Sequence, residues 1–398
     1  MPPPRTQNPP VVDATEGLKA TSGEDQLSDK NTTAKVEHLA RARYAIDGQI
    51  KRILKADALK VSPEKFPANV HRTVACTWIR IGDLSMVKPK GRDSFHYKGL
   101  ATCGSVHACA ICASKIQERR RQEVALAIAY AATIERVPFM ASFTFPHRVD
   151  QPLALLLKLQ QEAIKKLRGS RAYMALMLRC KAAGRIRNLE VTHGQNGWHP
   201  HTHELLFLDG ETCPALLREE LARLWLKACK SVGLFLPARD AESDFLRRSV
   251  DVRAGDLGAA GYMAKMDDQS KWGLSHELTK SSSKQGRRAG CHPFRLAEQD
   301  STAHLFVEYV RAMKGQRQLV WSRGLKAAVG VVEKTDEEIA QEEVTRVDDR
   351  IPVAPAAWRF VLGNDARWEG LNAAKIGGRP GVDRFLAMLG YKDPETPQ

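Results

Sequence analysis

The sequence predicts an α+β fold in which helices pack on an antiparallel sheet. From about residue 137, segments with strand and helix patterns follow in the order strand, helix, strand, strand, helix, strand, helix. Apolar residues recur at helical spacing in residues 153–167 and 214–232, whereas they alternate with polar residues in 186–193. This order around a central hairpin is typical of an antiparallel sheet covered by helices.

The N-terminal part is expected to be a disordered segment followed by a helical, cysteine-rich region. Residues 1–40 contain few large apolar side chains, so we predict disorder there. The formal net charge of +15 favours a polyanionic partner for the chain, and we interpret residues 41–134 as a DNA-binding region. A helix that begins near Ser114 carries Arg119 and Arg120, which could contact DNA phosphates; a solvated face is the alternative.

Cysteines in this region have a spacing that favours metal binding. Three lie within ten residues, in Cys103-Gly-Ser-Val-His-Ala-Cys-Ala-Ile-Cys112. One further cysteine upstream is the best candidate for a fourth ligand. The predicted ligands are Cys76, Cys103, Cys109 and Cys112. Four thiolates are typical of a structural Zn²⁺ site, which would staple residues 76–112. Reduced thiols on a helix are the alternative.

The sequence carries no secretory or membrane signal that we recognise. The first ten residues lack an apolar core, and no apolar run approaches the ~20 residues that a membrane span needs. We therefore expect a cytoplasmic protein without a membrane partner, in which close cysteines bind metal rather than form disulfides.

The stretch His199-Pro-His-Thr-His203 places three imidazoles at alternate positions at the start of an apolar run. Alternate side chains of a strand share a face, so His199, His201 and His203 predict a metal site on one side of the sheet. The strand before it and the turn-forming residues 194–197 predict a hairpin that can place Glu190 beside His201 or His203 as a further ligand. A solvated Glu190 is the alternative.

A candidate nucleophile follows the last predicted strand. Tyr262 and Lys265 are three residues apart, so they share a face of the short helix that Asp256 can cap. Tyrosine ionises near pKa ~10 and attacks poorly unless it is activated. A metal that polarises a phosphodiester, with a lysine to offset charge, would provide that activation. Tyr-x-x-Lys alone is a common helical pattern that is more often structural.

Together these stretches resemble the plasmid rolling-circle replication initiators, the Rep proteins of the HUH endonuclease superfamily. The similarity spans roughly residues 70–330. The stretches that carry it, in the family's order, are Cys103–Cys112, Ser142-Phe-Thr-Phe-Pro-His147, Gly197–His203, Gly261–Lys265, Trp272–Lys280 and Trp321–Lys326. The resemblance implies a ferredoxin-like HUH endonuclease core in residues 135–328, with its metal on the open face of the sheet.

The resemblance also implies a mechanism of nicking and rejoining. Tyr262 would become linked to the 5′-phosphate at a plasmid origin, and the freed 3′-hydroxyl would prime synthesis. His201 and His203 would be the metal pair, with Mn²⁺ or Mg²⁺ expected, and His199 belongs to the same pattern. Lys265 would assist at the phosphate. Plasmid origin DNA, a host helicase and a DNA polymerase are the implied partners.

One position departs from the family pattern. Many relatives carry a glutamate one helical turn before the tyrosine, where this chain has Gly258. Asp256 and Glu277 are candidates for the missing carboxylate, unless termination differs. Beyond the tyrosine, a polar stretch with Lys280 and Lys284 could wrap a DNA backbone; an unengaged loop is the alternative.

Residues 329–398 are predicted to form an acidic helix and a small helical subdomain. The chain has no Walker-type phosphate loop, so unwinding would require a separate helicase. Three other functions stay open: a relaxase or transposase of the same superfamily, a non-catalytic zinc-stabilised DNA-binding regulator, and a metallohydrolase of small molecules.

Overall fold

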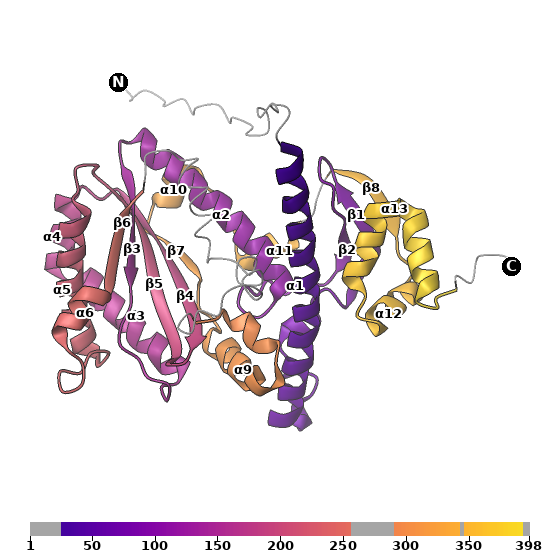
Figure 1. Ribbon diagram of the computed structural model, residues 1–398, viewed down its shortest axis with the longest axis horizontal. Helices are drawn as coiled ribbons and strands as arrows, with labels where there is room; N and C mark the ends of the chain where they lie inside the picture. Colours follow the sequence, from indigo (N-terminus) through magenta and orange to yellow (C-terminus); the bar gives the residue numbers. More distant parts are fainter. Residues whose placement is uncertain (1–24, 256–289, 343–345, 393–398) are drawn as a thin grey trace, which may run out of the picture.

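The computed structural model describes residues 25–255, 290–342 and 346–392. They form two antiparallel sheets, one of five strands and one of three, with helices packed around them. Figure 1 shows the long helix α1 (Asp25–Val61) standing between the two sheets. The predicted α+β class with antiparallel sheets is therefore confirmed.

The five-stranded sheet has the strand order β6-β3-β5-β4-β7, and every neighbouring pair is antiparallel. Its strands are β3 (Val137–Phe143), β4 (Gly184–Gly194), β5 (Gly197–Leu208), β6 (Val250–Ala254) and β7 (Leu319–Trp321). The first four, with the helices between them, run β–α–β–β–α–β along the chain. Numbered within this unit, their spatial order is 4-1-3-2, which is the ferredoxin-like arrangement.

One face of this sheet is covered by four helices that come from its two β–α–β crossings (Figure 1). They are α3 (Leu153–Gly169), α4 (Arg171–Arg179), α5 (Pro214–Val232) and α6 (Glu242–Arg248). Leu206 and Leu208 of β5 are buried in the same core as Leu156 of α3 and Trp225 of α5. The helices at 153–169 and 214–232 match the predicted ones closely because their apolar faces have a clear helical period.

The other face of the sheet is covered by α2 (Ala110–Thr133) over part of its length. Val124 and Ile128 of α2 pack with Ile186, Leu205 and Phe207. Because strand side chains alternate between faces, the odd-numbered residues of β5 all lie on this side. The three histidines therefore continue the α2 face toward the start of β5.

The second sheet joins distant parts of the chain. Its order is β2-β1-β8, from β1 (Arg80–Pro89), β2 (His96–Leu100) and β8 (Val347–Pro352). It has its own apolar core with α12 (Pro355–Gly363) and α13 (Arg367–Met388). Residues predicted to form the C-terminal subdomain thus share a sheet with strands of the predicted 41–134 region. The domain boundaries themselves stay a prediction.

The helix α1 contacts α2, α9 (Ala303–Ala312) and α13. It begins at Asp25, inside the segment for which composition predicts disorder. The remaining helices are short: η1 (Pro63–Lys65), η2 (Arg72–Val74), η4 (Pro293–Ala297), η5 (Asp300–Thr302), α10 (Leu325–Val329) and α11 (Asp336–Gln341). Among the residues described, none of the helices is both long and apolar enough to span a bilayer.

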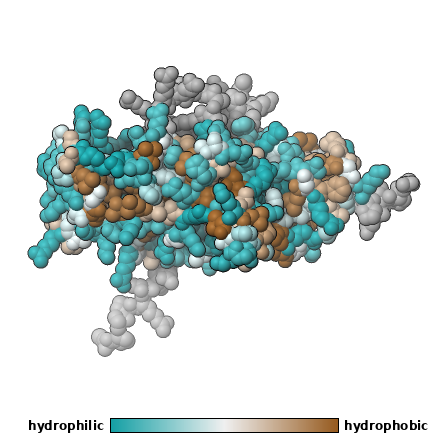
Figure 2. Space-filling model, turned by 90° about the horizontal axis from the view of Figure 1, so that it is seen from below, coloured by the Kyte–Doolittle hydropathy of each residue, from teal (hydrophilic) through white to brown (hydrophobic). Residues whose placement is uncertain are grey.

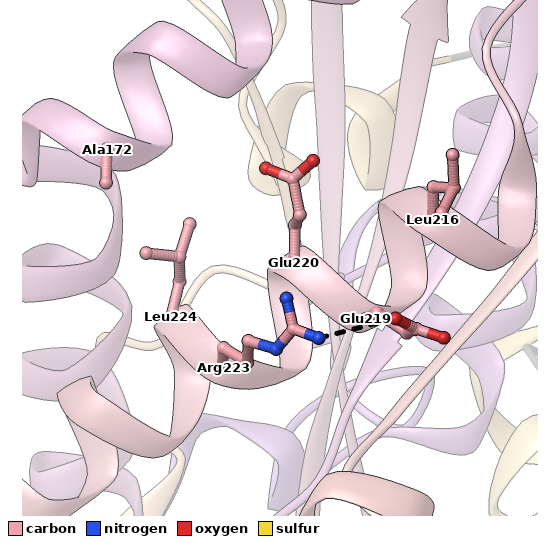
Figure 3. Close-up of a pocket in the computed structure, with 6 residues that line it drawn as sticks. All are labelled: Ala172, Leu216, Glu219, Glu220, Arg223 and Leu224. Atoms are coloured by element: carbon pink, nitrogen blue, oxygen red, sulfur yellow. Dashed lines mark hydrogen bonds and ion pairs between the residues drawn. The ribbon is translucent and has the colours of Figure 1, made fainter.

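On the face seen in Figure 2 the surface is mostly hydrophilic, and hydrophobic side chains form separate patches there. Exposed apolar side chains of α4 and α5 include Met174, Leu178 and Leu216. A pocket of about 330 Å³ lies on these two helices, and Figure 3 shows its lining with the ion pair between Glu219 and Arg223. None of the metal-site candidates lines it.

Candidate metal centres

The hairpin of β4 and β5 brings a carboxylate and two imidazoles together. Glu190 lies directly opposite His201 in the register of the two strands. The Oε2 atom of Glu190 is 3.0 Å from His201 Nε2 and 3.1 Å from His203 Nε2. The three potential ligand atoms lie within 4.8 Å of one another. The structure therefore places Glu190 beside these two histidines, as the hairpin pattern predicted.

The second ring nitrogen of each of these histidines has a hydrogen-bond partner. His201 Nδ1 is 3.2 Å from the carbonyl oxygen of His199, and His203 Nδ1 is 2.8 Å from Ser142 Oγ. A carbonyl oxygen only accepts, so Nδ1 of His201 donates to it, and Nε2 is the nitrogen that faces Glu190 and that a cation would take. At His203 the Ser142 hydroxyl is able to accept from Nδ1, and Nε2 again faces Glu190. Metal-binding histidines usually donate their other N–H in this way.

The protonation states expected at this centre also suit a cation. Burial alone would raise the pKa of Glu190, but hydrogen bonds with His201 and His203 outweigh it and hold that pKa well below its usual range. Glu190 is therefore a carboxylate at neutral pH. A carboxylate with two imidazole nitrogens is a donor set that fits a divalent transition metal.

His199 lies outside this group of three, one alternate position earlier on β5. Its ring centroid is 5.0 Å from that of His201, and its Nδ1 is 2.6 Å from His147 Nε2. Burial, followed by the neighbouring His201 and His147, lowers the pKa of His199 to about 3, so its ring is neutral at pH 7.

Several predicted functional residues lie outside the described residues. These are Asp256, Gly258, Tyr262, Lys265, Glu277, Lys280 and Lys284. Their roles therefore stay predictions from the sequence.

The second centre is formed by the four predicted cysteines, all of which are buried and free of disulfides. The Sγ atom of Cys76 is 3.5 Å from that of Cys112 and 3.6 Å from that of Cys109. The Sγ atoms of Cys103 and Cys112 are 3.8 Å apart. A tetrahedral zinc with Zn–S bonds of about 2.3 Å has S···S edges of about 3.8 Å. These three distances are close to that edge, and all four sulfur atoms lie within 4.8 Å of one another, so the cluster has a spacing that fits Zn²⁺.

Local structure explains how the cysteines converge. Cys109 caps the N-terminus of α2, where its sulfur accepts a hydrogen bond from the backbone N–H of Cys112 in the first turn. Cys76 follows the short helix η2, and Cys103 follows β2. Hydrogen bonds from Cys109 and Cys112 lower the pKa of the Cys103 thiol, whereas hydrogen bonding to Cys103 raises the pKa of Cys76 and Cys109, so Cys103 is the thiol most inclined to ionise before a metal binds.

A buried charge cluster adjoins these cysteines. Asp47 Oδ1 is 3.8 Å from Cys109 Sγ, and Asp47 pairs with both Lys51 and Arg367. Each of these three charged side chains is at most 1% exposed. Arg367 and Lys51 also donate to Thr77 Oγ1, at 2.9 and 3.3 Å, next to Cys76 in the chain. The two buried cations have one buried carboxylate and the partly exposed Asp365, whose Oδ1 is 3.7 Å from Arg367, so positive charge is in excess within the buried part of the cluster.

The arginines predicted to contact DNA have partners within the protein. Arg120 pairs with the buried Glu123 at 2.9 Å and with Asp336 at 3.1 Å, and it donates to the backbone oxygen of Lys334. Arg119 lies 3.7 Å from Glu123. Arg120 therefore links α2 to α11, and the DNA contacts of both arginines stay a prediction.

Ser142 and His147 are residues whose roles the sequence did not reveal. Both belong to the first motif stretch, but that stretch gives no indication of which partner either contacts. The register of β3 against β5 places Ser142 opposite His203. That pairing is non-local and could not be read from the local pattern.

Comparison with known proteins gives one distant relative. It is a protein named "Protein rep" from Streptomyces lividans, 26% identical over 298 residues, which cover 58% of this chain. The match spans 64% of that relative's own length. No family model matches the chain, and no solved structure matches it. The chain is thus distantly similar to a Rep protein over somewhat more than half its length.

Proposed function

We propose that this protein initiates plasmid replication by nicking one strand of origin DNA through a tyrosine. The observation that carries the proposal is the convergence of Glu190 Oε2, His201 Nε2 and His203 Nε2 on one face of a ferredoxin-like sheet. The distant similarity to a protein named for replication supports it. We infer an HUH-type endonuclease core from this combination.

The residues then divide the chemistry as follows. A divalent cation held by Glu190, His201 and His203 would polarise the scissile phosphodiester. The hydroxyl of Tyr262 attacks phosphorus, so a tyrosine O–P bond forms while the bond to the 3′ oxygen breaks. The phenolic proton is lost, and the 3′ oxygen takes up a proton to become the primer hydroxyl. Lys265 offsets the charge that develops on the phosphate.

Rejoining reverses this transfer, since the 3′ oxygen of a strand attacks the phosphotyrosine and releases the tyrosine hydroxyl. Two nitrogen donors favour Mn²⁺ over Mg²⁺ at this centre, because magnesium prefers oxygen ligands. We also infer that Cys76, Cys103, Cys109 and Cys112 bind a structural Zn²⁺. Four thiolates around Zn²⁺ carry a net charge of about −2, which would offset the buried cations Lys51 and Arg367.

The proposal is tested with a labelled single-stranded origin oligonucleotide and Mn²⁺. We expect a denaturant-resistant protein–DNA adduct, with peptide mapping that places the DNA on Tyr262. Tyr262→Phe should abolish the adduct and retain DNA binding, whereas Tyr130→Phe on α2 serves as a matched control that keeps both.

The same assay separates the rival functions. An adduct that maps to a residue other than Tyr262 contradicts the mechanism. A non-catalytic regulator predicts binding without any adduct in the parent protein, and a small-molecule metallohydrolase predicts turnover without one. A relaxase or transposase would make the same adduct, but it would not support synthesis from the 3′ end in a reconstituted plasmid replication reaction.

A further inference from the structure

Two arginines of β4 lie on the helix-covered face of the five-stranded sheet, opposite the face that carries the histidines. Arg187 pairs in register with Glu204 of β5, and Arg185 pairs with Leu206. Residues paired directly across two strands point to the same face, and Leu206 belongs to the core that α3 and α5 form with the sheet. Both arginines therefore lie on the α3 side of the sheet.

Two side chains from the helices complete this cluster. Arg168, near the C-terminal end of α3, forms an ion pair with Glu204, whose side chain is only 1% exposed. Tyr173 comes from α4. Burial and then Glu204 raise the pKa of Tyr173, whereas Arg185 and Arg168 lower it, so these groups lie close together. Three guanidinium groups thus surround a single buried carboxylate.

The charge of the cluster is unbalanced. Glu204 pairs with Arg168, and within the described part of the chain neither Arg185 nor Arg187 has an acidic partner. The Nε atoms of Arg168 and Arg187 are buried, and in that same part of the chain they have no hydrogen-bond acceptor. Burial, followed by the neighbouring Arg168, lowers the pKa of Arg187. A bound anion would supply both the missing acceptors and the missing negative charge.

The cluster reaches the surface beside β7, the short strand at the edge of the sheet. Its three arginines are all partly exposed. Gln161 of α3 donates to the side chain of Gln316 just before β7, so this side of α3 faces the edge strand. Lys165 is exposed and shares that side of α3 with Gln161 and Arg168, because residues three and four apart on a helix are neighbours.

The geometry points to a phosphate-binding surface for duplex DNA that flanks the cut. This arginine surface comprises Lys165, Arg168, Arg185 and Arg187. Guanidinium groups bind phosphate oxygens through paired hydrogen bonds, and such contacts position DNA without reading its sequence. In the proposed reaction the scissile phosphodiester is bound on the other face of the sheet, so the arginine surface holds a different segment. This inference rests on the proposed function only in requiring that the chain binds DNA.

The salt dependence of DNA binding tests the surface directly. The probe is a fluorescein-labelled duplex oligonucleotide of random sequence, titrated with the full-length protein without added Mn²⁺ and followed by fluorescence anisotropy. Each phosphate contact adds about 0.9 to the slope of log affinity against log salt. We expect Arg185→Gln and Arg187→Gln each to reduce the slope by about 1. Arg187→Lys keeps the charge and should keep the slope.

Two further variants separate a lost contact from a damaged fold or a general loss of charge. Lys165 is exposed and unpaired, so Lys165→Gln should leave the fold intact and still reduce the slope. Arg359→Gln, on the exposed side of α12, removes the same charge from the C-terminal unit and should leave the slope unchanged.

Unchanged slopes in the three glutamine variants of the arginine surface would overturn the inference, as would an equal reduction in Arg359→Gln. A reduction seen with single-stranded but not with duplex DNA would overturn the assignment to a duplex. None of these readouts depends on nicking. Duplex binding that requires the arginine surface, in a protein that forms no DNA adduct, would refute the proposed function and leave this surface intact.

Discussion

We expect Ser142 to determine how firmly Glu190, His201 and His203 hold a cation. Its Oγ is 2.8 Å from Nδ1 of His203 and is able to accept a proton from it, which holds the ring toward Glu190. Ser142→Ala removes that acceptor, and we expect the Mn²⁺ dissociation constant to rise about tenfold. Isothermal titration calorimetry measures it, with Ser142→Thr as the variant that preserves the hydroxyl. Equal affinities for the alanine variant and the parent would show that His203 needs no such support.

The cysteine centre makes a prediction about metal content. We expect the purified protein to carry close to one equivalent of zinc per chain, since the sulfur atoms already have tetrahedral spacing. Cys76→Ser removes one of four thiolates and should lose that zinc. Cys213→Ser alters an exposed cysteine at the start of α5 and should keep it. Elemental analysis by mass spectrometry decides between these outcomes, and a zinc-free parent protein would contradict the proposal.

At the residue scale, local patterns predicted which of the candidate ligands would lie close together. Glu190 and the histidines belong to one hairpin, so alternation and a turn suffice to place them together. Three of the cysteines lie within ten residues. The pairing of Ser142 with His203 and of Asp47 with Arg367 depends on contacts between distant segments, and no local pattern contains that information.

At the scale of elements, Arg120 links helix α2 to helix α11. It bridges Glu123 of α2 and Asp336 of α11, and Glu123 is only 2% exposed. Arg120→Ala leaves that carboxylate without its closest cation, so we expect the free energy of unfolding to fall by about 1–3 kcal/mol. Arg223→Ala on the exposed side of α5 should change it by less than about 0.5 kcal/mol.

Urea denaturation followed by circular dichroism measures both values. A neutral Arg120→Ala that weakens DNA binding would instead favour the phosphate contact predicted from the sequence. The helices α3 and α5 were predictable because an apolar face repeats along each of them. The strands β1 and β8 were harder to anticipate, since their pairing joins residues on either side of the five-stranded core.

At the scale of the whole molecule, Arg367 connects the C-terminal unit to the cysteine centre. It begins α13 and donates to Asp47 on α1 at 2.7 Å and to Thr77 at 2.9 Å. Four thiolates around zinc are anionic, so a nearby cation should stabilise the loaded form. Arg367→Met should therefore release zinc to a competing chelator faster than the parent protein does. The matched variant Arg379→Met, on the exposed part of α13, should not.

Chelator competition followed by a colorimetric zinc indicator gives the two rates. Equal rates would mean that the buried cations do not support the metal. Limited proteolysis of the chelated protein provides a second measurement, because loss of the anionic centre should loosen the packing of α13 against α1 and expose that junction to cleavage.

The small sheet also constrains how the chain can be made. Its hairpin, β1 and β2, leaves the ribosome well before β8, since residues 101–346 lie between them. A two-stranded hairpin is marginally stable in water, and β1 offers an unpaired edge until β8 arrives. During synthesis the five-stranded sheet can therefore fold first, whereas the β1–β2 hairpin cannot complete its sheet until β8 has been synthesised. A nascent chain stalled just short of residue 347 should hold a folded core beside an unfinished sheet, a state in which chaperone binding would be concentrated on β1.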